Sequence, residues 1–161
     1  MEEFRRLYEE NYRMVLFYLK HLCKDDKLAE DLTQDTFYHV LFHLCSGKKL
    51  DVNRKWFIKV AHNVFLDHLR KSKVTPESLE IHADTLESRS GAVTADSANR
   101  LDLFAALGKL PVRYKSLILL KDHYGFSYRE IAEITGSTEA SVKVSIFRAR
   151  SKFKEVYKAY E

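Results

Sequence analysis

Residues 127–150 read SYREIAEITGSTEASVKVSIFRAR, and this stretch decides the fold of the C-terminal part of the chain. Ser127 and Glu130 have the spacing of a capping box, in which each side chain satisfies a backbone donor at the start of a helix. Gly136 follows the apolar Ile131 and Ile134, and it can adopt the left-handed conformation that ends a helix and redirects the chain. The segment therefore predicts two helices around a glycine turn.

The second of these helices is amphipathic. Thr138 or Ser137 can cap it. One predicted inward stripe contains Val142, Ile146, Ala149 and Phe153, and the opposite face carries Lys143, Phe147, Arg148 and Arg150. This layout is typical of a helix-turn-helix whose second helix enters the major groove of DNA. A plain helical hairpin with a solvated basic face has the same pattern, so the segment alone leaves both interpretations open.

The bulk composition agrees with a mostly helical protein. The 161 residues are 45% hydrophobic with only 2 Pro and 5 Gly, which permits one or two small domains with an apolar core. The net charge is +4, and residues 100–161 hold 12 basic but only 7 acidic side chains. A basic final segment is expected of a module that binds phosphate groups.

The two cysteines and the N-terminus indicate a cytoplasmic setting. Cys23 and Cys45 lie inside helical patterns without metal-type spacing, so we expect buried free thiols in a reducing compartment. The sequence begins MEEFRR, which is unlike a signal peptide, and no apolar run approaches the roughly 20 residues that span a bilayer. We therefore expect a soluble protein without direct membrane insertion.

Hydrophobic periodicity divides the chain into two helical regions. Three helices are predicted in residues 1–71: a long one from about Phe4, a second closed by Ser46 and Gly47, and a third over about residues 54–71, capped by Asn53. The pattern is lost over residues 72–99, which predicts a flexible acidic linker, with an extra helix around residues 79–86 as the alternative. Residues 100–161 are again helical, with one helix over 112–124 after Pro111. The predicted fold is all-α, with two small helical domains on a tether.

Three further phrases give the chain a family resemblance. They are AEDLTQDTF at 29–37, WFIKVAHN at 56–63 and LPVRYK at 110–115. In this order, together with the helix-turn-helix, they resemble the extracytoplasmic-function (ECF) sigma factors of bacterial RNA polymerase. The resemblance implies a region-2-like N-terminal domain, a region-4-like C-terminal domain, and a subunit that binds core RNA polymerase and promoter DNA. It also implies control by an anti-sigma factor, no enzymatic activity of the chain itself and no cofactor.

The resemblance implies three groups of functional residues. The second helix would bind polymerase through Glu30, Asp31, Gln34 and Asp35. The third helix and the loop before it would melt and read the −10 element, with Asn63 helping to receive a flipped base and Lys48, Lys49, Asn53, Arg54, Lys55, Trp56, Lys59, Arg70 and Lys71 around it. The helix-turn-helix would read the −35 element through Arg113, Thr138, Lys143, Val144, Phe147 and Arg148. Among the residues assigned to the −10 element, Trp56 is expected to pack in the core instead of stacking on a base.

The sequence departs from the family pattern at several positions. Val144 and Ser145 replace a common serine and arginine, and we expect them to help determine which promoters are chosen. His62 stands where Arg is frequent, and Ser137 replaces a hydrophobic turn residue. These departures affect the promoter sequence rather than the role.

Two other functions are consistent with parts of the sequence. A conventional helix-turn-helix regulator would bind duplex operator DNA without polymerase, but it would not need the acidic second helix or the aromatic and basic residues around Trp56. A metal-dependent enzyme could use His39 and His43, which are spaced i, i+4. No third ligand accompanies them at a recognisable spacing, and His62 and His68 are explained by packing or by a surface position. We therefore expect neither a metal site nor catalytic residues.

Overall fold

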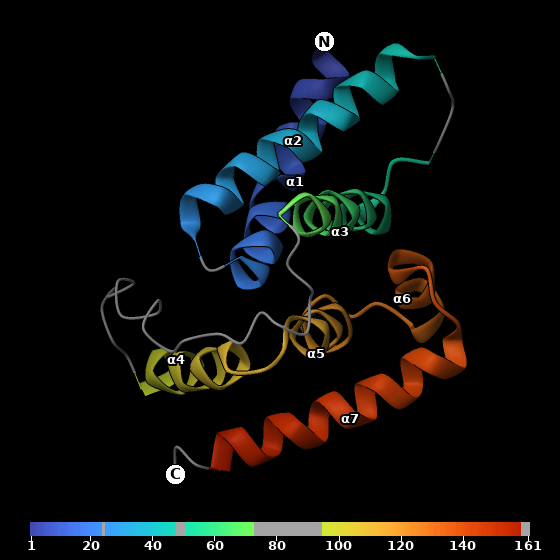
Figure 1. Ribbon diagram of the computed structural model, residues 1–161. Coiled ribbons are helices and arrows are strands. Elements are labelled where there is room, and N and C mark those ends of the chain that lie inside the picture. The colour runs from blue at the N-terminus through green and yellow to red at the C-terminus, as the bar shows by residue number, and fades with distance from the viewer. Residues whose placement is uncertain (24, 48–50, 73–94, 159–161) are drawn as a thin grey trace.

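The computed structural model describes residues 1–23, 25–47, 51–72 and 95–158, and every regular element in these ranges is helical. This confirms the all-α class. The elements are α1 (Glu2–Leu22), α2 (Asp26–Cys45), α3 (Arg54–Lys71), α4 (Ala95–Gly108), α5 (Val112–Ile118), a π-helical turn η3 (Leu119–His123), α6 (Tyr128–Thr135) and α7 (Glu139–Lys158). Helices α1–α3 form one group and α4–α7 another, and the two groups lie against each other (Figure 1).

The N-terminal group is held by large side chains at the meeting of its three helices. Tyr18, Phe37 and Phe57 are almost fully buried there. Two caps fix where α2 and α3 begin: Asp25 Oδ1 accepts a hydrogen bond from Lys27 N at 2.9 Å, and Asn53 Oδ1 accepts one from Trp56 N at 2.9 Å. The predicted cap and bounds of the third helix are confirmed.

A buried polar pair lies inside this group. Tyr18 Oη and His62 Nδ1 are 2.9 Å apart in a hydrogen bond between α1 and α3. Burial disfavours the charged imidazolium and lowers the pKa of His62 to about 4. His62, at the position where the family often has Arg, therefore holds two helices together as a neutral side chain.

The helix-turn-helix forms as the sequence predicts. Glu130 N donates to Ser127 Oγ at 3.1 Å while Ser127 N donates to Glu130 Oε1 at 3.0 Å, which completes the capping box. Gly136 has a φ of 68°, and this left-handed turn ends α6. The inward stripe of α7 is buried at Val142, Ile146 and Ala149.

The helix predicted over residues 112–124 is not uniform. It is α-helical only to Ile118 and continues as the π-helical turn η3, in which Tyr124 N donates to Leu119 O at 2.9 Å. A π-turn holds one more residue than an α-turn, and both Leu119 and Leu120 are buried in this one. The same turn directs Tyr124 toward α1, where its hydroxyl donates to the Met14 carbonyl at 3.0 Å.

The two groups of helices contact each other, whereas the sequence predicted only that two domains are joined by a linker. Helix α3 packs against α6 and α1 against α5, and buried side chains of both groups belong to one connected apolar core. Helix α4 begins at Ala95, inside the range assigned to the linker, while the alternative helix at 79–86 lies outside the described residues. The boundaries 1–71, 72–99 and 100–161 stay a prediction.

The cysteines differ from expectation in one respect. Cys23 is buried, and burial raises the pKa of its thiol to about 12. Cys45 is exposed because it is the last residue of α2 and faces away from the core. Helical periodicity did not distinguish the buried thiol from the exposed one, because Cys45 lies at the end of a helix.

Candidate nucleic-acid interface

The exposed face of α7 brings together the residues predicted for the −35 element. Lys143, Val144, Phe147 and Arg148 are all exposed, and Phe147 retains 73% of its accessible surface despite being aromatic. Lys143 Nζ lies 4.0 Å from Glu139 Oε1 and 5.6 Å from the centroid of the Tyr128 ring. This face therefore offers cations and apolar groups together, which is the chemistry that reads base edges in a major groove.

Phosphate-binding candidates flank this face. Thr138 caps α7, since its Oγ1 accepts a hydrogen bond from Ser141 N at 3.1 Å. Arg113 is exposed, and its Nη2 donates to Ser145 Oγ at 3.2 Å. The free amides at the start of α7 and the guanidinium of Arg113 are both suited to a backbone phosphate.

Two α7 residues, Ser145 and Arg150, contact other side chains of the protein instead of lying free on the proposed DNA-reading face. Ser145 is only 7% exposed and contacts Arg113, so it faces inward and cannot touch bases directly. Arg150, expected on the open face, pairs with Asp122 of η3 through Nη2 to Oδ1 at 2.7 Å and Nε to Oδ2 at 3.2 Å. Of the two unusual residues, only Val144, which is 50% exposed, can contact DNA.

The exposed face of α3 carries a second polar strip. Lys59 and Asn63 are exposed one helical turn apart, and Arg70 and Lys71 extend the strip at the end of the helix. Arg70 Nη1 also lies 3.2 Å from Asp67 Oδ1. Lys48 and Lys49 lie outside the described residues.

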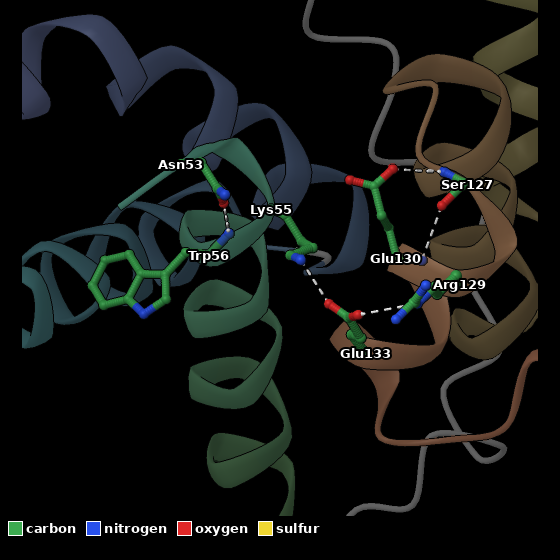
Figure 2. A network of polar contacts seen from close by, with 7 residues as sticks. All are labelled: Asn53, Lys55, Trp56, Ser127, Arg129, Glu130 and Glu133. Carbon is green, nitrogen blue, oxygen red and sulfur yellow. Dashed lines mark hydrogen bonds and ion pairs between the residues drawn. The ribbon is translucent and has the colours of Figure 1, made fainter. Parts of the chain in front are cut away.

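Several residues at the start of α3 that were predicted to bind DNA make contacts within the protein. Trp56 is partly buried, with its ring centroid 5.2 Å from that of His43 and 5.5 Å from that of Phe57. Asn53 caps the helix. Lys55 contacts α6 of the other group of helices, which the sequence did not indicate (Figure 2).

Helix α2 presents the acidic face expected to bind polymerase. Glu30, Asp31, Gln34 and Asp35 are all exposed, and Gln34 Nε2 donates to Tyr8 Oη at 3.3 Å. The same face continues into Tyr38 and Phe42, which are 75% and 74% exposed. Sequence reasoning missed these two aromatic residues. The available signal was the helical period, which puts them off the inward stripe that contains Phe37 and Val40.

The described residues provide no support for a metal centre. Nowhere in the ranges with described placement do three His, Cys, Asp or Glu side chains gather as a metal site requires. His39 is exposed and His43 packs beside Trp56. Among the described residues, no helix combines the length and apolar character needed to cross a membrane.

Two family models match the chain in the order that the fold suggests. The sigma-70 region 2 model matches residues 7–75, and the sigma-70 region 4 model matches residues 100–153. The ECF RNA polymerase sigma factor SigM of Bacillus subtilis is 31% identical over 157 residues, which cover 92% of this chain and 94% of SigM. The sigma factor SigV of the same organism is 31% identical over 141 residues, covering 88% of this chain and 80% of SigV.

Solved structures show the same fold. The sigma factor RpoE of Bartonella quintana, solved with the anti-sigma factor NepR, matches with a TM-score of 0.73 and 24% identity over 98% of each chain. CnrH, solved with the cytosolic domain of CnrY, matches with a TM-score of 0.66 and 21% identity over 98% of this chain and 89% of CnrH. The two region models and the relatives show that the chain belongs to the ECF sigma factors, the subunits that direct RNA polymerase to specific promoters.

Proposed function

We propose that this sigma factor divides promoter recognition between two helices, with α3 melting and reading the −10 element and α7 reading the −35 element. The observation that supports this division is the pair of separate exposed faces, one holding Lys59 and Asn63 and the other Lys143 and Phe147. An exposed amide beside cations suits an unstacked base, whereas an amphipathic helix with cations and an aromatic residue suits duplex DNA.

The exposed face of α2 is the proposed docking site for core polymerase. Its carboxylates complement a basic partner, and such complementarity steers the approach of the partner. Tyr38 and Phe42 extend the face with large apolar surface, which is the feature that anchors protein interfaces. Catalysis then belongs to the polymerase, and the chain acts in the cytoplasm where core polymerase is found.

An anti-sigma factor is the proposed regulatory partner. RpoE of Bartonella quintana was solved with the anti-sigma factor NepR, and CnrH was solved with the cytosolic domain of CnrY. The exposed α2 and α7 faces are the surfaces whose occlusion would silence the proposed function. The test is to co-purify the tagged chain and ask whether a partner blocks core binding.

The deciding experiment is in vitro transcription with core polymerase and a library of promoter sequences. The expected result is transcription from a small set of promoters that share −10 and −35 sequences, and none without the chain. A conventional operator-binding regulator makes the opposite prediction. Tight, specific binding of the free chain to duplex promoter, unchanged by core polymerase, would contradict the proposal.

A further inference from the structure

A hydrogen bond between side chains joins α5 to α7 beside the proposed −35 face. Arg113 Nη2 donates to Ser145 Oγ at 3.2 Å. Arg113 is exposed, whereas Ser145 keeps only 7% of its accessible surface. The bond therefore fixes the end of a long charged side chain to a buried point on α7.

Both residues of this bond belong to well-anchored parts of the backbone. Arg113 lies in the first turn of α5 beside buried Val112, and its carbonyl accepts a hydrogen bond from Ser116 Oγ at 2.9 Å. Ser145 precedes buried Ile146 within α7, and α5 packs along α7 (Figure 1). The place of the guanidinium is thus set by two packed helices instead of a loop, which favours a precise contact.

The bond brings a cation to the edge of the proposed DNA-reading face. Ser145 lies four residues after Ser141 and three before Arg148, so these three residues form one strip along α7. Ser141 and Arg148 are exposed, and Arg148 belongs to the proposed reading face. Ser145 has no charge of its own. The Arg113 guanidinium therefore adds, from α5, a positive charge in the middle of this strip.

Within the described part of the chain, no carboxylate pairs with Arg113. Its hydrogen bond goes to a neutral hydroxyl, whereas Arg150 pairs with Asp122 through Nη2 and Oδ1, which are 2.7 Å apart. Arg113 and Ser145 both line a cleft of about 260 Å³, and none of the described residues that line it is acidic. A guanidinium stays charged in proteins and has five N–H donors, of which this bond uses one. The other donors can therefore bind an anion from outside the chain.

We propose that Ser145 is a positioning residue for Arg113, and that it holds the guanidinium where it binds one backbone phosphate at the edge of the −35 element. The inference rests on the proposed assignment of α7 to that element. Binding a phosphate restricts a long arginine side chain, and the bond to Ser145 imposes much of this restriction before DNA arrives. The phosphate contact has no base preference of its own, but it fixes the register in which Lys143 and Phe147 meet the bases.

Binding of the reconstituted holoenzyme to fluorescent promoter fragments over a range of salt concentrations tests this role. The compared chains are wild type, R113A, S145A and the double variant R113A/S145A. R6A is the charge control, because Arg6 is an exposed arginine near the start of α1 and the N-terminus lies far from α7 (Figure 1). One fragment contains both promoter elements, and a second is truncated so that the −35 element and its phosphates are missing.

The two single variants are expected to differ in kind. R113A should lower affinity for the full fragment about ten- to thirtyfold and reduce the slope of log affinity against log salt by about 0.9, the share of one phosphate. S145A should lower affinity about three- to fivefold but keep the wild-type slope, because the guanidinium still neutralises the phosphate without being held in advance. In the R113A background S145A should have no further effect. R6A should match wild type, and the truncated fragment should bind all the chains equally.

These outcomes do not follow from a purely structural role of Ser145. Alanine is favoured in a helix, so S145A is expected to fold, and thermal unfolding checks this. S145A that binds as tightly as wild type, an equal loss from S145A in the R113A background, or R113A with the wild-type salt slope would each overturn the proposal. A loss in R113A that depends on the base sequence of the −35 element would overturn the phosphate contact.

The truncated fragment separates this proposal from the proposed function. If the wild-type holoenzyme binds the full and truncated fragments equally, α7 does not contact the −35 region and both proposals fail. If wild type prefers the full fragment and K143A loses its −35 preference, while R113A and S145A behave as wild type, the −35 assignment stands. The positioning role of Ser145 then fails by itself.

Discussion

Asn63 is the residue on which the −10 assignment depends most. Its amide is exposed on α3 beside Lys59, and it can both donate and accept hydrogen bonds. Asn63→Ala should impair open-complex formation, seen as lost permanganate reactivity of the melted bases, without changing affinity for core polymerase. Asn11→Ala is a suitable control, since that amide donates to the Leu7 carbonyl of its own helix. Equal loss of melting and of core binding would contradict the assignment.

Lys143 is the residue with the clearest predicted base contact. A good contact to guanine acceptors contributes about 1–3 kcal/mol of discrimination, so Lys143→Ala should weaken −35-dependent initiation by roughly that amount. The measurement compares initiation at promoters with intact and mutated −35 elements. Lys152→Ala removes a lysine from the same helix and should leave the −35 preference as it was. An unchanged preference in Lys143→Ala would remove Lys143 from the reading face.

His62 should make stability depend on pH. Its folded pKa of about 4 lies below the ordinary value of 6.5, so the unfolded chain binds the proton first as pH falls. The stabilisation from neutral His62 is present above pH 6.5 and is lost between pH 6.5 and 4, by about 3 kcal/mol in total. Denaturant unfolding at pH 7 and pH 5 should show a smaller loss in His62→Gln, which does not titrate, than in wild type. The control His39→Gln changes an exposed histidine. Its free energy of unfolding should fall between pH 7 and pH 5 by as much as that of wild type.

At the scale of elements, the two sides of α2 differ in their chemistry. Its inward side is buried at Leu32, Phe37 and Val40, while its outward side joins acids to the exposed Tyr38 and Phe42. Phe42→Ser should lower affinity for core polymerase by about 1–3 kcal/mol, because an aromatic anchor at an interface is lost. Thermal unfolding should change little. Leu103→Ser, at another exposed apolar residue, is the control, and equal affinities for polymerase in all three chains would exclude Phe42 from the interface.

Local signals decided most of the elements. The Ser127 and Glu130 capping box, the Asn53 cap and the Gly136 turn depend on neighbours within a few residues, so the sequence contains them completely. The π-turn η3 does not, because the extra residue at 119–123 is placed by packing of Leu119 and Tyr124 against other helices. Ser145 is different, because its place three residues after Val142 and four before Ala149 puts it on the inward side of α7 by helical period alone.

At the scale of the whole molecule, the sequence predicts which residues form the two DNA-reading faces. It does not predict how the two faces are placed relative to each other. The periodicity of α3 and α7 shows which side chains point outward on each helix. It contains no information about whether Lys55 meets Glu133, which is 78 residues away along the chain.

The amino-acid sequence by itself determined the all-α class, the helix-turn-helix and the family, since these depend on periodicity, caps and short motifs. Only the tertiary structure decided that Arg54 and Lys55 contact the C-terminal part of the chain and that Arg113 donates a hydrogen bond to Ser145. The physical reason is the range of the interactions involved. Helices follow from hydrogen bonds and side chains a few residues apart, whereas burial and ion pairing between domains follow from contacts that the chain makes only once it has folded.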